Sequence, residues 1–70
     1  MINTYSEAIR KLRAKMDLSQ EALAKKLGVV FSSVNRWENG HNEPTIKIKR
    51  KIKELCQREN IDIDSTISEQ

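Results

Sequence analysis

Apolar side chains recur at steps of three and four residues near the start of the chain, which is the period of an α-helix. The run consists of Tyr5, Ala8, Ile9, Leu12 and Met16. Thr4 stands just before it and Glu7 follows three residues later, which is the spacing of a capping box. The pattern predicts a helix over residues 5–16.

A second, shorter helix is predicted over residues 20–27. Leu18 and Leu23 flank Ser19 at the positions of a hydrophobic staple, with Ser19 as the N-cap. Gly28 is suited to the left-handed conformation that ends a helix. A helix of about two turns is not stable by propensity alone, so packing must stabilise it.

A third helix is predicted over residues 31–38, with Val34 and Trp37 on one face and an Asn-Gly pair at residues 39–40 after its end. The spacing favours Trp37 as a core residue rather than a platform for base stacking. Val30 occupies the N-cap position, where a missing side-chain acceptor costs about 1 kcal/mol. Something other than local propensity must therefore favour Val30 there.

A fourth helix is predicted over residues 46–58, with Thr45 as its cap. Its apolar positions at helical spacing are Ile48, Ile52, Leu55 and Cys56. Residues 46–49 alternate as a strand would, but the later positions keep the helical period and no second strand is available for pairing. We expect Cys56 to be a small buried hydrophobe.

Together these elements predict an all-α fold, a compact four- or five-helix bundle with a central helix-turn-helix. Residues 1–60 are assigned to this domain, and residues 61–70 to an acidic C-terminal tail or a short fifth helix that Asp62 or Asp64 would cap. A length of 70 residues fits one domain, and 37% hydrophobic with 33% charged residues is an ordinary globular composition.

The charge is unevenly distributed. Residues 1–58 hold 13 Lys and Arg against six acids, whereas residues 59–70 hold four acids and no base. A basic body favours a polyanionic partner, although an acidic protein or membrane headgroups would also suit it. The chain has no apolar run long enough to cross a bilayer and no secretory leader at its start, so we expect an intracellular, cytoplasmic protein and no membrane partner.

Enzymatic and metal chemistry have little support. One cysteine, Cys56, cannot form an intramolecular disulfide, and with His41 as the single histidine there are too few soft ligands for a structural zinc site. No carboxylate cluster is placed against either residue, so neither a nucleophile nor a general acid–base pair is assembled. We expect no catalytic residue, no metal and no cofactor.

The segment over residues 20–39 has the organisation of a helix-turn-helix. Small Ala24 lets the second helix cross closely, Gly28 provides the positive φ of the turn, and Val29 and Val34 fill the angle between the helices.

The stretch LSQEALAKKLGVVFSSVNRWENGHNEPT resembles the signature of the Cro/C1-type (XRE-like) helix-turn-helix DNA-binding proteins of phages and bacteria, and the similarity covers about residues 6–58. The resemblance implies a bundle of four or five helices whose third helix enters the major groove, with Gln20 touching a phosphate. It also implies an ion pair between Arg13 and Glu38. The chain departs from the family at Val30-Phe31, where such proteins often have a Ser or Thr cap followed by a polar residue.

Candidate base-contacting residues lie on the third helix, because positions 32, 35 and 36 share a face. An apolar side chain suits a thymine methyl, Asn suits adenine and Arg suits guanine, although Arg36 could equally bind phosphate. The candidates are Phe31, Ser32, Asn35 and Arg36. Candidate backbone-contacting residues are Gln20, Ser33, Asn39, His41 and Lys47. The remaining basic side chains of residues 47–53 are interpreted as a solvated helix face.

The leading hypothesis is a sequence-specific double-stranded DNA-binding protein, a small bacterial or phage transcriptional regulator of the repressor type. We expect a homodimer on two half-sites about one helical turn apart, with Ile61, Ile63 and Ile67 as candidates for the dimer surface. The alternatives are a protein-interaction adaptor, with a protein partner in place of DNA, and a DNA-targeting subunit of a larger nucleic-acid enzyme or of a restriction or toxin–antitoxin system.

Overall fold

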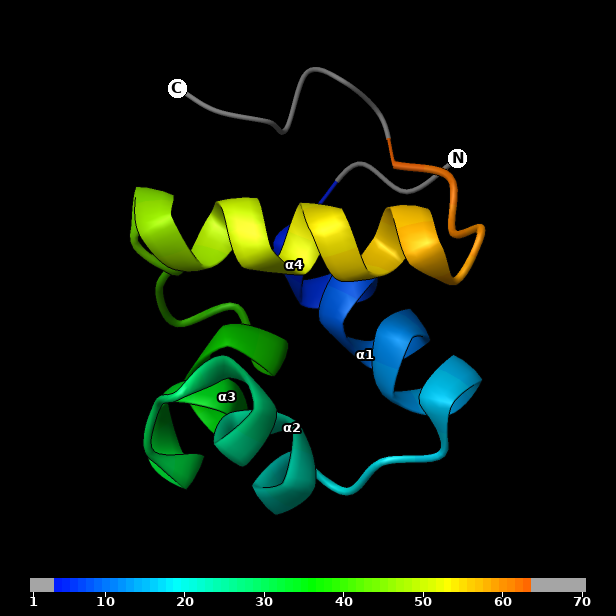
Figure 1. The fold of residues 1–70 in the computed structure, drawn as a ribbon. Coiled ribbons are helices and arrows are strands. Elements are labelled where there is room, and N and C mark those ends of the chain that lie inside the picture. Colours follow the sequence, from blue (N-terminus) through cyan, green and yellow to red (C-terminus); the bar gives the residue numbers. More distant parts are fainter. Residues whose placement is uncertain (1–3, 64–70) are drawn as a thin grey trace.

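The computed structural model describes residues 4–63 and contains four helices (Figure 1). They are α1 (Tyr5–Met16), α2 (Gln20–Leu27), α3 (Phe31–Glu38) and α4 (Ile46–Arg58). All four predicted helices, with their bounds, are confirmed, as is the all-α fold class. Most of the predicted tail or fifth helix, from residue 64 on, lies outside the described residues, and the division of the chain at residue 60 stays a prediction.

Three side chains were predicted to cap the N-terminal ends of helices, and two of them do so. The Thr4 hydroxyl accepts a hydrogen bond from the Glu7 N–H at 3.1 Å, and the Ser19 hydroxyl accepts one from the Ala22 N–H at 3.0 Å. Thr45 occupies the N-cap position of α4, but its side chain makes no capping hydrogen bond, so that part of the prediction is wrong. The start of α4 is therefore set by packing and by the Thr45 carbonyl, which accepts from the Lys49 N–H at 2.8 Å.

The core lies where the four helices meet. α3 packs on both α1 and α2, while α4 packs on α1 and also touches α2 (Figure 1). The largest fully buried side chains come from every helix: Ile9, Leu12, Leu23, Leu27, Val34, Ile52 and Cys56. Burial of one such side chain stabilises a fold by about 1.5–3 kcal/mol, so shared packing holds together α2 and α3, which are each only eight residues long.

Two side chains with a possible chemical role belong to this core. Trp37 is only 8% exposed, which confirms it as a packing residue. Cys56 is fully buried, and burial raises the pKa of its thiol to about 11, so the thiol stays protonated at neutral pH. Cys56 is thus confirmed as a small hydrophobe.

Ile61 packs against its own domain rather than facing a partner. Its side chain is buried with the core, and its N–H donates to the Cys56 carbonyl at 2.8 Å. Ile63 is partly buried against the same core. This burial removes Ile61 from the candidates for a dimer surface, and Ile67 lies outside the described residues. No helix within residues 4–63 has the length and apolar character needed to cross a membrane.

Candidate nucleic-acid interface

The crossing of α2 and α3 depends on the small and left-handed residues between them. Ala24 is 3% exposed, and Gly28 ends α2 with a φ of 76°. The Val29 N–H closes the turn by donating to the Ala24 carbonyl at 2.9 Å. Val34 of α3 is fully buried. These residues therefore have the steric roles predicted for them. Together they fix the way in which α3 crosses α2.

A bidentate ion pair joins α1 to α3. Arg13 Nε lies 2.5 Å from Glu38 Oε2, and Arg13 Nη2 donates to Glu38 Oε1 at 3.1 Å. Within residues 4–63, Glu38 is the one charged residue that is buried, with 4% exposure, whereas the Arg13 side chain remains about a quarter exposed. The ion pair implied by the family resemblance is thus present, and it lies partly in the protein interior.

The environment of this pair favours the charged form of both partners. Burial alone would raise the pKa of the Glu38 carboxyl, but hydrogen bonds from Arg13 and Gln20 and the positive charges of Arg13 and Arg10 outweigh burial and lower it. The hydrogen bond and the charge of Glu38 raise the pKa of Arg13, against a smaller opposing effect of burial. Glu38 is therefore a carboxylate at neutral pH.

Two further side chains of α1 hold the end of α3. Ser6 Oγ and Arg10 Nη2 each donate to the backbone carbonyl of Glu38 at 2.7 Å. A cation at this position complements the negative end of the α3 dipole. The sequence reasoning missed Ser6 and Arg10. The available signal was their helical spacing with Arg13, which places the three polar side chains on one face of α1.

A chain of side-chain amides extends from this pair along α3. Gln20 Nε2 donates to Glu38 Oε1 at 2.9 Å, and Gln20 Oε1 accepts from Asn35 Nδ2 at 3.2 Å. Asn35 Oδ1 in turn accepts from Asn39 Nδ2 at 3.3 Å. The structure thus joins Gln20, Asn35 and Asn39 in one hydrogen-bonded chain, although each was predicted to contact DNA independently. Each amide nitrogen carries two hydrogens, so each keeps one donor for a further ligand.

The other predicted contact residues lie at the surface with free polar groups. Within residues 4–63, no protein hydrogen bond or ion pair engages the side chains of Ser32, Ser33, Arg36, His41 and Lys47. Ser33 is half-buried and the other four are exposed. Phe31 is 48% exposed.

The basic side chains of α4 do not all point into solvent. Lys49 Nζ pairs with Glu43 at 2.9 Å and lies 5.3 Å from the centre of the Tyr5 ring. Lys51 Nζ donates to the Leu27 carbonyl at 3.4 Å. The interpretation of this run as a solvated face is therefore wrong for Lys49, whose side chain is only 16% exposed, whereas Lys51 stays exposed while it contacts α2.

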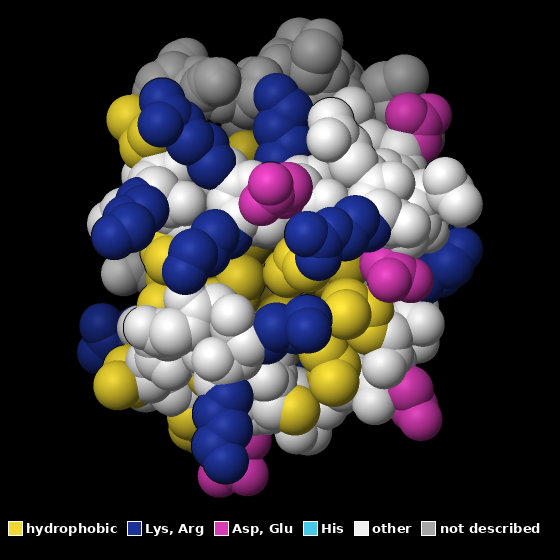
Figure 2. Space-filling view, in the orientation of Figure 1, with side chains coloured by type: hydrophobic (Ala, Val, Ile, Leu, Met, Phe, Trp, Pro, Cys, Tyr) yellow, Lys and Arg dark blue, Asp and Glu magenta, His cyan; other side chains and the backbone are white. Residues whose placement is uncertain are grey.

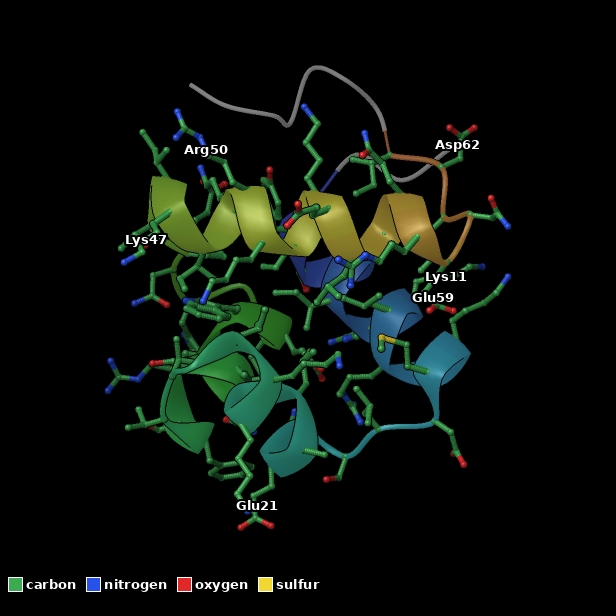
Figure 3. The ribbon with its side chains drawn as sticks, viewed as in Figure 1. Lys11, Glu21, Lys47, Arg50, Glu59 and Asp62 are labelled. Carbon is green, nitrogen blue, oxygen red and sulfur yellow. The ribbon has the colours of Figure 1, made fainter. Side chains whose placement is uncertain are left out.

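Lys47 and Arg50 lie differently on α4. Lys47 stands at the N-terminal end of the helix, and Arg50 on the side of α4 away from α2 and α3 (Figure 3). Lys and Arg side chains are spread across the face that includes α4 and α2, around an apolar area between these helices (Figure 2). This distribution gives the molecule a basic face suited to a polyanion.

A comparison with protein-family models matches residues 9–59 to the family described as helix-turn-helix. No curated protein and no solved structure matched the chain. The matched range contains α2, α3 and α4 and most of α1, and so includes the ion pair and the amide chain.

Glu38→Gln should lower the free energy of unfolding by about 2–4 kcal/mol at neutral pH, because Arg13 loses its charged partner in a largely buried site. The pKa of Glu38 is lower in the folded chain than its ordinary value of 4.5. The stability that its charge contributes is therefore complete above that value and disappears as the pH falls through the lower folded value. Urea denaturation should show the gap between wild type and variant shrinking as the pH falls below 4.5.

Glu43→Gln is the matched control, because its carboxylate also pairs with a lysine but its side chain is 70% exposed. We expect it to change stability by less than about 1 kcal/mol. Equal losses in the two variants, or a gap for Glu38→Gln that persists in acid, would contradict the role assigned to the Glu38 charge.

Proposed function

The chain belongs to the Cro/C1-type helix-turn-helix family of DNA-binding proteins, and from this premise we propose that it is a sequence-specific transcriptional regulator of the repressor type, from a bacterium or a phage. It binds double-stranded DNA with α3 in the major groove. The proposed activity is binding without catalysis.

The observation that carries the proposal is the division of α3 into two sides. Val34, Trp37 and Glu38 are buried, so the inner side of the helix is fixed against α1 and α2. Phe31 and Arg36 are exposed on the outer side. A helix with its side chains is about 10–12 Å across, which matches the major groove at about 12 Å wide. The outer side of α3 therefore fits the groove without rearrangement of the fold.

The residues of this outer side have separate roles. Arg36 donates two parallel hydrogen bonds to a guanine, and Phe31 covers an apolar base feature. Ser32 uses its free hydroxyl on a base edge. Asn35 reaches a base through the amide hydrogen that Gln20 leaves unused and through the remaining lone pair of its oxygen.

The surrounding polar residues position the duplex by contacting its backbone. The cationic contact among them is Lys47, and His41 lies in the loop before α4. Neutralised phosphates release counterions, so affinity should fall steeply as salt rises. The set is Gln20, Ser33, Asn39, His41 and Lys47.

One module of this size makes few base contacts, so the regulator acts as a homodimer on two half-sites about one helical turn apart. Its DNA ligand places it in the cytoplasm with the nucleoid.

Selection from a random duplex library of about 30 base pairs tests the proposal, because that length holds two half-sites one turn apart. We expect an enriched inverted repeat that persists near physiological salt. Retention at low salt alone, with no enriched motif, would contradict sequence-specific regulation. The basic face would then serve an adaptor, or a DNA-targeting subunit of a larger restriction or toxin–antitoxin assembly, whose specificity comes from its partner.

Arg36→Ala and Lys47→Ala should weaken binding in different ways. Loss of a bidentate guanine contact should cost about 1–3 kcal/mol and relax the preference at one base pair. Loss of Lys47 should weaken binding to all sequences alike and reduce the salt slope by about one. Fluorescence anisotropy titrations on the selected site and on a scrambled duplex, each at several salt concentrations, measure both effects.

Arg50→Ala is the control for Lys47, because Arg50 is a cation of the same helix that lies on the side away from α3 (Figure 3). It should leave the salt slope nearly unchanged. If Arg36→Ala has no effect at any base pair, the assignment of the outer side of α3 as the reading surface is wrong.

A further inference from the structure

Two apolar side chains stand exposed at the start of α3. Val30 is 66% exposed and Phe31 is 48% exposed, and within residues 4–63 the one other large hydrophobic side chain with comparable exposure is Ile46 at 50%. We name Val30 and Phe31 the apolar edge. It lies at the N-terminal end of the helix proposed to enter the groove.

Folding does not account for the apolar edge. Val30 fills an N-cap position without making a side-chain capping hydrogen bond, where Ser or Thr would stabilise the helix. The exposed parts of both side chains remain in contact with water, so they contribute nothing to the hydrophobic stabilisation of the free protein. The exposed parts of these side chains gain apolar contact only when a ligand covers them.

The chemistry around the apolar edge favours DNA as that ligand. Arg36 is exposed further along the same helix, and Lys25 lines an open cleft together with Phe31. Glu21 lines the same cleft and offsets the charge of Lys25 there, whereas the Arg36 side chain has no acidic partner in the part of the chain that the structure describes. Two side chains are far too few for a stable protein interface, which buries about 1,200 Å² or more. They are enough to cover one or two groups on a base edge.

The polar alternatives along α3 are limited. Asn35 is the residue best suited to read adenine, but its amide oxygen accepts from Asn39 and its nitrogen donates to Gln20. An asparagine held in this way keeps one amide hydrogen and one lone pair for a base, but its two hydrogen bonds fix the orientation in which it can present them. A larger share of the readout therefore falls to the residues that start the helix.

We infer that the apolar edge reads thymine through its C5 methyl group, which is the apolar feature that the base edges present in the major groove. The inference rests on the proposed function and specifies the base feature that the start of α3 recognises. Each selected half-site should then contain one or two thymines whose methyl groups are in contact with Phe31 or Val30.

Replacing thymine by deoxyuridine tests this inference, because it removes the methyl group and leaves the base pair intact. Each thymine of the selected half-site is replaced in turn, and Kd is measured by fluorescence anisotropy for the wild-type protein. At the contacted positions we expect a loss of about fourfold, the factor for one buried group of methylene size. At the other thymines the replacement should change little.

The protein variants assign the effect to the apolar edge. In Phe31→Ala or Val30→Ala the same replacement should change Kd by much less than in wild type, because the methyl group has lost its partner. Ile46→Ala is the matched control: it removes an equally exposed apolar side chain outside α3 and should keep the full methyl effect. Circular dichroism checks that each variant is folded.

Two outcomes would overturn the inference. One is that no thymine shows a methyl effect in the wild-type protein, and the other is that the effect is unchanged in both apolar-edge variants. If the protein still selects a preferred sequence in either case, its proposed function as a sequence-specific regulator is not contradicted. Failure to select any preferred sequence would overturn the proposed function and the inference with it.

Discussion

The buried carboxylate of Glu38 is the interaction on which the arrangement of this small protein depends. A carboxylate removed from water is tolerated only when hydrogen-bond donors and a positive charge surround it. Those donors come from Arg13 on α1 and Gln20 on α2, while Glu38 itself belongs to α3. One residue thereby ties three helices together. Apolar packing alone would tolerate small shifts between helices, whereas a bidentate pair with further hydrogen bonds is satisfied in one arrangement.

The hydrogen bonds around Glu38 hold the C-terminal end of α3 and leave the side chains at its N-terminal end free to contact a ligand. Ser6 and Arg10 hold the carbonyl of Glu38, so the C-terminal end of the helix is fixed to α1. The N-terminal end has no side-chain cap and exposes Phe31. The amide chain joins the ion pair through Gln20 to Asn35 and Asn39, so it also acts on the C-terminal half of the helix. The helix is therefore positioned by interactions at its far end, while its leading residues remain free for a ligand.

Periodicity was sufficient to predict the four helices, and capping chemistry added a local signal at the starts of α1 and α2. Ser19, Gly28 and the apolar spacing specify where the helices begin and end without reference to the rest of the chain. The role of Thr45 was not predictable in the same way, since a residue suited to capping caps only if its side chain adopts the required rotamer. The burial of Ile61 was also missed, because an apolar residue beyond the last helix gives no sign of whether it folds back on the core.

The contacts within the site were harder to predict than the helices, because they depend on how the helices pack against one another. A surface Gln or Asn has many possible partners, and Gln20 and Asn35 meet only because α2 and α3 cross at a particular angle. Their spacing along the chain carries no periodic signal for this contact. The ion pair came from the family resemblance, whereas the contribution of Ser6 and Arg10 required the orientation of α1 against the end of α3.

The most direct test of this account is the ratio of affinities for the selected site and for a scrambled duplex, measured in Glu38→Gln under conditions where circular dichroism shows it folded. Glu38 is buried and cannot touch DNA, so any change in the ratio reports the placement of α3. We expect the ratio to fall about tenfold, comparable to the loss of one base-pair contact, with affinity for the scrambled duplex nearly unchanged. An unchanged ratio in the folded variant would show that α3 is positioned without the Glu38 carboxylate, and would contradict the central role given to it here.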